Sequence, residues 1–241
     1  PLQPLDHIWN TGDPAQIIFF TAISRFQQPA AGKRSAAHLE SLRAIIANPL
    51  RLPFYYHNSE VSEHISAAAV VPVMLETLTD PVSLTVIHKA PFYELQGSLH
   101  RRGHTAALQT LQLRYGYFIL IGDTLLLVND LHLLDVIDFF RKQAAAVSIH
   151  QSGYPAFKRN VLSKLENRLP VDYSYLQPAT PDQAGQYAPQ ERIIYLSDLG
   201  NFVTVHPVIR YGETEIPVLT QRHIFAVNDK GKEYTVRRDD A

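Results

Sequence analysis

The chain has 241 residues, a length that suits one large domain or a few smaller ones. Hydrophobic residues make up 46% of it, and no apolar run approaches the roughly 18–20 residues that a membrane span needs, so we expect no membrane partner. The formal net charge is -1, so any contact with nucleic acid needs a local patch. Cysteine is absent, which excludes disulfide bonds, thiol catalysis and zinc ribbons, and suggests a cytoplasmic location.

Residues 1–80 are predicted to form an N-terminal α/β subdomain. The run 17–23, Ile-Ile-Phe-Phe-Thr-Ala-Ile, is β-branched and aromatic and predicts a buried strand. Ser35 is placed to cap a helix that runs to about Ala47 and ends before an Asn-Pro pair.

Residues 81–176 predict a central subdomain of hairpins and helices. Strands are expected over 81–88 and 92–99, and the two apolar runs of YFILIGDTLLLVND meet at Gly122-Asp123, a two-residue hairpin signal with glycine first. Glycine in that position favours a positive φ.

Two helices are expected in the second half of this subdomain. Asn129 or Asp130 caps the first, over 131–142, and a short strand over 147–150 precedes the second. Ser152 is placed to cap the second helix, with Pro155 in its first turn. Its apolar face is expected to consist of Phe157, Val161, Leu165 and Leu169.

The C-terminal part has a different pattern. Residues 177–190 are rich in Pro, Gln and Ala without a period and predict a linker. Residues 191–241 contain five short apolar runs separated by turn signals, which indicates an all-β meander or small barrel. The fold class predicted for the whole chain is therefore α+β, rich in antiparallel strands, with a few helices.

The segment AAGKRS resembles a phosphate-binding loop only in part. Such a loop needs Gly-x-x-x-x-Gly-Lys-Ser/Thr, whereas here Gln27 stands at the first glycine and Arg34 at the hydroxyl position. A polar loop explains the segment better than nucleotide binding does. No cofactor is expected in this chain.

The densest group of histidines spans His57 to His64. On a helix, His57, Glu60 and His64 would share one side, which could hold zinc or serve a small hydrolase. The spacing matches no zincin pattern, however, and the intervening Asn-Ser favours a turn. Solvated residues at the start of an element are the simpler interpretation.

A second polar group lies in the sequence HRRGH. Here His100 and His104 flank Arg101 and Arg102 in a turn between two expected strands. Clustered cations at a loop tip can contact phosphates without reading sequence, although an ordinary basic turn is the alternative.

Catalytic patterns are otherwise missing. Ser98 lacks the flanking glycines of a nucleophile elbow, and Asp135 and Asp138 are expected on the polar face of their helix. Four cations of the second helix are expected to be a solvated face and not a single strip, namely Lys158, Arg159, Lys164 and Arg168. The residues therefore predict no self-contained active site.

A family resemblance rests on a series of segments taken in order: APFYELQGSL, YFILIGDTLLLVND, FFRK, SKLENRLPVDYSY, ERIIYLSD, VIRYGETEIPVL and TVRRDD. Over about residues 81–241 they resemble the region upstream of the motor in bacterial Swi/Snf-type helicase-like ATPases. In that family a charged RRD followed by acidic residues leads toward the two-lobed ATPase. The chain also begins with Pro1, and its single methionine is Met74, so we expect a piece of a longer protein.

The resemblance implies a non-catalytic accessory region of a cytoplasmic DNA helicase or translocase. Its partners would be the parent protein's own ATPase motor and DNA, with ATP and magnesium bound by that motor and not by this chain. The motor's phosphate loop, Walker-B box and arginine fingers are absent from the sequence, so no family catalytic residue can be assigned here. The candidate contacts are His100, Arg101, Arg102 and His104. A protein-interaction module unrelated to DNA is the alternative function.

Overall fold

The computed structural model describes residues 12–28, 34–59, 61–143, 146–218, 220 and 222–238. The chain divides into two compact units, which are described separately. Unit 1 combines the described residues up to Asp80 with Leu108–Lys142, and unit 2 combines Pro81–Ala107 with the described residues from Gln143 onward. Residues 81–176 therefore contribute to both units.

Unit 1 begins with two helices, α1 (Pro14–Gln27) and α2 (Ala36–Ala47). The expected strand over 17–23 is wrong, because this run lies inside α1. Asp13 caps α1 by accepting a hydrogen bond from the backbone amide of Ala15, and Pro14 occupies the first turn, where its missing N–H costs nothing. The predicted cap of α2 by Ser35 is confirmed.

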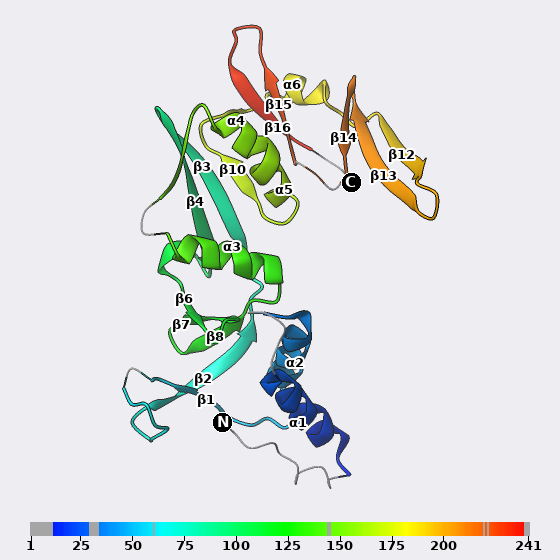
Figure 1. The fold of residues 1–241 in the computed structure, drawn as a ribbon. Coiled ribbons are helices and arrows are strands. Elements are labelled where there is room, and N and C mark those ends of the chain that lie inside the picture. Colours follow the sequence, from blue (N-terminus) through cyan, green and yellow to red (C-terminus); the bar gives the residue numbers. More distant parts are fainter. Residues whose placement is uncertain are drawn as a thin grey trace. The chain divides into compact units, whose positions relative to one another are not determined.

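The sheet of unit 1 has the strand order β1-β2-β8-β7-β6 (Figure 1). Its strands are β1 (Phe54–His57), β2 (Val70–Thr77), β6 (Gln112–Arg114), β7 (Phe118–Ile121) and β8 (Thr124–Leu127). The hairpin β7–β8 has Ile121 opposite Thr124, and Gly122 between them has a φ of 60°, so the predicted two-residue turn is confirmed. A short 3-10 helix, η1 (Leu108–Thr110), precedes β6.

Helix α3 (Leu131–Arg141) follows the hairpin in unit 1. Asp130 accepts hydrogen bonds from the backbone amides of His132 and Leu133, which confirms the cap. Leu134, Ile137 and Phe140 are buried, as the helical spacing predicts.

Unit 2 is built on the sheet β10-β3-β4-β5, and β9 also pairs with β4. The strands are β3 (Val82–Lys89), β4 (Phe92–Arg101), β5 (His104–Ala107), β9 (Val147–His150) and β10 (Val171–Tyr173). Strand β10 runs parallel to β3, while β4 pairs antiparallel with its neighbours. The predicted strands over 81–88, 92–99 and 147–150 are confirmed.

The second predicted helix is present but is not uniform. It consists of α4 (Tyr154–Phe157), a π-helical turn η2 (Lys158–Leu162) and α5 (Ser163–Leu165). Ser152 is not its cap, because the N-cap is Gly153 and the Ser152 hydroxyl lies 2.8 Å from Nδ1 of His150. Pro155 does lie in the first turn.

The π-helical turn changes which face of this helix is buried. A wider turn adds a residue and rotates everything that follows relative to a regular α-helix. Leu162 and Glu166 are therefore buried, whereas Val161, expected in the core, is 38% exposed. The predicted apolar face is wrong in its middle part, and the rotation places a carboxylate inside.

The C-terminal part of unit 2 contains two three-stranded sheets, β12-β13-β14 and β11-β16-β15. Their elements are β11 (Gln177–Pro178), α6 (Pro181–Gly185), β12 (Glu191–Asp198), β13 (Val203–Tyr211), β14 (Thr214–Pro217), β15 (His223–Val227) and β16 (Glu233–Arg237). Residues 177–190, expected to be a linker, thus hold β11 and α6, and Thr180 with Gln183 forms a capping box on α6.

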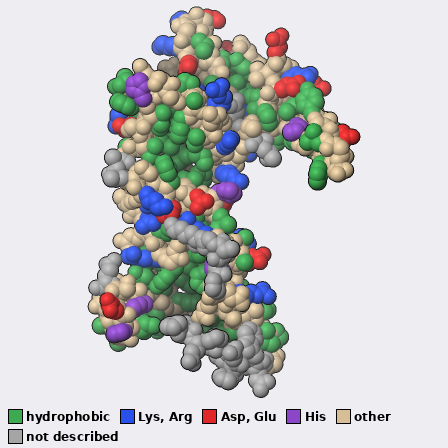
Figure 2. Space-filling view, in the orientation of Figure 1, with side chains coloured by type: hydrophobic (Ala, Val, Ile, Leu, Met, Phe, Trp, Pro, Cys, Tyr) green, Lys and Arg blue, Asp and Glu red, His purple; other side chains and the backbone are tan. Residues whose placement is uncertain are grey.

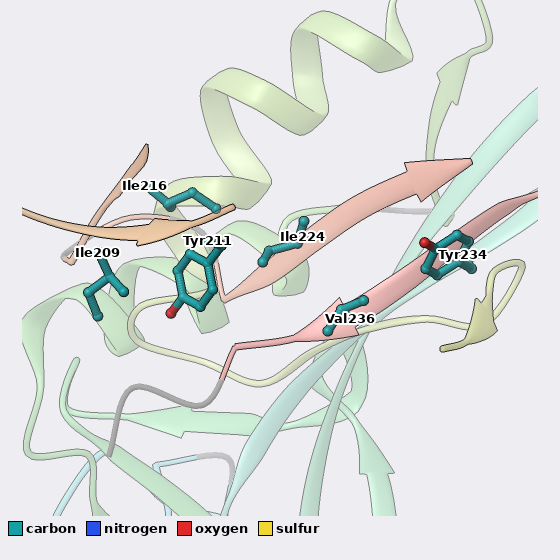
Figure 3. Packing of buried hydrophobic residues seen from close by; sticks show 6 residues of the cluster. All are labelled: Ile209, Tyr211, Ile216, Ile224, Tyr234 and Val236. Carbon is teal, nitrogen blue, oxygen red and sulfur yellow. The ribbon is translucent and has the colours of Figure 1, made fainter. Parts of the chain in front are cut away.

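One apolar cluster joins these two sheets (Figure 3). Its members are Ile209, Tyr211, Ile216, Ile224, Tyr234 and Val236. Ala179, Ala184 and Tyr187 pack against the cluster, so the segment around α6 closes it. The predicted strands of the C-terminal part are confirmed, and so is the α+β class with predominantly antiparallel sheets. Within the described residues, no helix combines the length and the hydrophobicity that crossing a membrane requires.

Candidate nucleic-acid interface

Four arginines of unit 2 line one open groove of about 610 Å³. They come from distant parts of the sequence: Arg168 follows α5, Arg222 precedes β15, Arg237 ends β16, and Arg238 comes directly after it. Ser83 and Asp172 lie on the groove wall as well. The antiparallel pairing of β15 with β16 explains part of this gathering, because it sets His223 opposite Arg237 and brings the start of one strand beside the end of the other.

The groove is held together by Glu166, whose side chain is 1% exposed. One of its carboxylate oxygens accepts a hydrogen bond from the Tyr173 hydroxyl on β10. The other accepts from the backbone amides of Arg222 and His223, the latter at 3.1 Å. This carboxylate therefore ties the helical segment to β10 and to the entry of β15, and it fixes the backbone that carries Arg222.

The environment of Glu166 keeps it ionised. Burial by itself raises the pKa of this carboxyl, but hydrogen bonds from His223, Tyr173 and the Arg222 amide, together with the nearby His223 ring, outweigh it. The pKa of Glu166 is consequently lower than its ordinary value. Burial and the adjacent carboxylate raise the pKa of Tyr173, which stays a neutral donor.

The four arginines differ in their surroundings. Arg238 is 6% exposed, and its Nε lies 3.1 Å from the Tyr211 hydroxyl. The guanidinium carbon lies 5.5 Å from the centre of the Tyr211 ring. Its Nη1 donates to the carbonyl of Pro217. Arg238 therefore stabilises the junction of the two C-terminal sheets, whereas Arg168, Arg222 and Arg237 have exposed side chains on the groove.

Lys158 has a structural position close to this region. Its ammonium lies 3.2 Å from the centre of the Phe225 ring and 5.6 Å from that of Tyr173. Burial lowers the pKa of Lys158, while Glu233 and Glu166 oppose that shift. The expectation that Lys158, Arg159, Lys164 and Arg168 form a plain solvated face is therefore wrong for Lys158, which packs on aromatic rings, and incomplete for Arg168, which lines the groove.

The predicted basic loop is a tight hairpin turn beside the groove. Arg102 and Gly103 form the turn between β4 and β5, with φ values of 47° and 81°. The ring of His100 lies 2.7 Å from the hydroxyl of Ser83, which lines the groove. Its other nitrogen lies 3.0 Å from the hydroxyl of Thr105. Arg102 and His104 are exposed, and Arg101 is half-buried.

The other polar groups singled out in the sequence do not assemble in this way. His57 ends β1 and its Nε2 lies 3.0 Å from the carbonyl of Ser62, while His64 belongs to an irregular segment, so no helix aligns them. Glu60 lies outside the described residues. Among the residues that are described, no cluster of three or more histidines and acids could hold a metal ion.

Arg34 and Asp138 form an ion-pair cluster in unit 1. The side chain of Arg34 is 7% exposed and bonds to the carbonyl of Gly116 at 2.7 Å, with Asp135 at 3.2 Å and Asp138 at 3.6 Å. Asp138 is 8% exposed and also contacts Lys142 at 3.2 Å, so its expected place on the polar face is wrong. These contacts anchor α3. Residues 30–33 of the phosphate-loop-like segment lie outside the described residues, and its last residue, Ser35, caps α2.

Sequence reasoning missed Arg222, Arg237 and Arg238 as members of one surface. A signal was present, since a hairpin brings cations at its two ends together whenever its strands pair in register. The position of Arg168 depends on the π-helical turn and on long-range packing, which the local pattern does not reveal.

A scan against protein-family models, a search of curated proteins and a search of solved structures found no match for this chain.

Proposed function

We propose that this chain is a non-catalytic accessory region of a Swi/Snf-type, DNA-associated ATPase, and that unit 2 contacts the phosphate backbone of DNA along the arginine groove. The observation that carries the proposal is the gathering of Arg168, Arg222 and Arg237 on one concave surface in a chain whose net charge is only -1. Guanidinium groups suit phosphate because their planar donors match its oxygens.

The electrostatics of the groove support an anionic ligand. Arginines outnumber the two acids that line it, and the carboxylate of Glu166 is already engaged by three donors. A concave surface with one predominant sign of charge concentrates oppositely charged ligands. The groove is open and offers no enclosed chamber, which suits a polymer better than a small metabolite.

The hairpin turn of β4 and β5 would add cations to this contact with DNA. His100 shares a hydrogen bond with Ser83 on the groove wall, and the exposed Arg102 comes two residues after it in the chain. Contacts of this kind position a protein on a duplex without reading its sequence. The role of the unit would be to place the parent's motor on DNA.

The test is salt-dependent binding of the purified chain to a fluorescent duplex oligonucleotide. We expect weak binding, since backbone contacts alone give dissociation constants of roughly 10⁻⁴–10⁻⁶ M at physiological salt. Replacing Arg168 and Arg237 together by alanine removes two contacts and should lower the slope of log affinity against log salt by about 2.

Lys230 and Lys232, in the exposed turn at the far end of the β15–β16 hairpin, provide the matched control. Their double alanine variant loses the same formal charge and should leave the slope close to that of the parent chain. An equal reduction in both variants would mean that general charge, and not the groove, drives binding. An unchanged slope in the arginine variant would refute the groove as a DNA contact.

A protein-interaction function also has a specific observation in its favour. The hairpin β12–β13 exposes an apolar face, which marks interaction surfaces when it is contiguous.

A further inference from the structure

One face of the hairpin β12–β13 carries a row of exposed apolar side chains. Side chains of paired residues share a face, so Ile194, Leu196, Val203 and Val205 lie together, in line with Ile209 further along β13. Ile209 is buried in the cluster between the C-terminal sheets, but the other four are 57% to 68% exposed. Figure 2 shows hydrophobic side chains, in green, on the outer part of this hairpin.

The opposite face carries a polar network beside Ile193 and the buried Val208. Arg210 forms ion pairs with Glu191 at 2.5 Å and Glu215 at 2.7 Å, and the Tyr195 hydroxyl donates to Glu215 at 3.0 Å. A network of this kind fixes β12, β13 and β14 relative to one another. This network therefore holds the sheet together. On the other face, no described residue packs against the outer half of the apolar row.

Strand β12 is also the edge of its sheet. The amide of Leu199 donates to the carbonyl of Phe202, so these two residues form a hydrogen-bonded pair. Hydrogen-bonded and non-hydrogen-bonded pairs then alternate along β12 and β13. By that alternation the amides and carbonyls of Arg192, Ile194, Leu196 and Asp198 point away from β13. The strand carries no proline and no lysine, the residues that commonly protect an edge from pairing.

We propose that a second copy of this chain pairs its own β12 antiparallel to this edge, with Tyr195 of each copy at the two-fold axis. The charges of the strand select this register. Arg192 of one copy then lies opposite Asp198 of the other, and this occurs at both ends. Between them, Ile194 lies opposite Leu196 on the apolar face.

The same register also matches the backbone. The residues whose amides and carbonyls point outward are Arg192, Ile194, Leu196 and Asp198. In this register the backbone of Arg192 forms hydrogen bonds with that of Asp198 in the other copy, and Ile194 does so with Leu196. A shift of two residues in either direction keeps the backbone match but breaks both charge pairs: one shift places Arg192 opposite Leu196, and the other places Asp198 opposite Ile194. The result is one continuous six-stranded sheet in which the apolar faces of the two copies adjoin, an isologous arrangement.

The experiment measures the mass of the whole chain in solution by analytical ultracentrifugation over a range of concentrations. We expect a reversible dimer. Arg192→Asp and Asp198→Arg should each weaken dimerisation by at least roughly tenfold, because each puts like charges opposite one another at both ends. Mixing the two variants in equal amounts should restore a dimer, because every cross-strand pair then has opposite charges.

Lys230→Asp, at the exposed turn of another hairpin, makes the same change in net charge as Arg192→Asp and should leave the dimer intact. A parent chain that stays monomeric at all concentrations overturns the proposal. So does a dimer that survives both single variants, which would use a different surface, or a failure of the mixed variants to associate. Each variant's circular dichroism spectrum should match that of the parent, so that a loss of fold is distinguished from a loss of pairing.

Discussion

Replacing Glu166 by glutamine tests the claim that one buried carboxylate organises the arginine groove. The substitution keeps the size of the side chain but changes one oxygen into an NH₂ group. The native carboxylate faces three donors: the Tyr173 hydroxyl and the backbone amides of Arg222 and His223. An amide side chain offers only one oxygen. If that oxygen faces the two backbone amides, the NH₂ group donates to the Tyr173 hydroxyl, whose own proton is left without its acceptor.

The expected loss of stability follows from these contacts. A buried donor left without an acceptor costs about 1–3 kcal/mol, and hydrogen bonds to a charged group contribute more than neutral ones. With one donor orphaned and the remaining bonds reduced from charged to neutral, Glu166→Gln should lower the free energy of unfolding by about 2–4 kcal/mol. Tyr173→Phe removes a single donor and should cost about 1 kcal/mol.

The assay is urea unfolding of both variants, repeated as a function of pH. The folded-state pKa of Glu166 is lower than its ordinary value, so its ionised form contributes stability that is fully present above about pH 4.3, near the unfolded-state pKa. That contribution disappears as the pH falls through the lower folded-state pKa. The stability gap between the parent chain and Glu166→Gln should therefore be widest near neutrality and should narrow in acid.

Two results would refute the reasoning. An unfolding midpoint within experimental error of the parent would show that the carboxylate is dispensable. A gap that stays constant from neutral pH into acid would show that the loss arises from packing and not from the ionised group. Glu166→Gln should also weaken DNA binding, because the backbone that carries Arg222 loses its anchor.

Three further predictions concern other parts of the chain. Gly122→Val should lower the free energy of unfolding by about 1–3 kcal/mol, because a β-branched residue is strained at a φ of 60°. Gly122→Asn should be close to neutral, and equal denaturant midpoints for the two variants would contradict this. Arg101→Ala combined with Arg102→Ala in the full-length protein should lower the salt slope of DNA binding by about 2, and a changed ATPase rate with an unchanged slope would point to contact with the motor instead. The chain alone should release no phosphate from ATP, since its phosphate-loop pattern lacks the first glycine and the hydroxyl, and DNA-stimulated release would contradict this.

Local patterns predicted many of the strands and turns of this chain, but they did not predict β2, and the strand predicted over 17–23 is a helix. The β7–β8 hairpin was visible because Gly122 separates two apolar runs. The run 17–23 misled because β-branched and aromatic residues favour strands only weakly, and the Asp13-Pro14 cap outweighed them. Propensity is a weak guide when a helix start of this quality is present.

The groove itself lay beyond sequence reasoning for a physical reason. Its members meet only because β15 pairs with β16 and because the π-helical turn rotates Glu166 inward. A one-residue change of helical phase leaves no mark in composition or in hydrophobic spacing. The basic turn at Arg102 was found from sequence, since a polar glycine-containing segment between two strands is a local signal.

The division of the chain into two interleaved units has a consequence for its synthesis. The polypeptide passes from one unit to the other at residues 80–81, 107–108 and 142–143. During translation, β3, β4 and β5 emerge before α3, yet β4 gains its partner β9 and β3 gains β10 only after unit 1 has been completed. Unit 1 can fold while β3 and β4 of unit 2 still lack their partners β10 and β9. We therefore expect a nascent chain that pauses between residues 107 and 147 to be the form most exposed to aggregation and most dependent on chaperones.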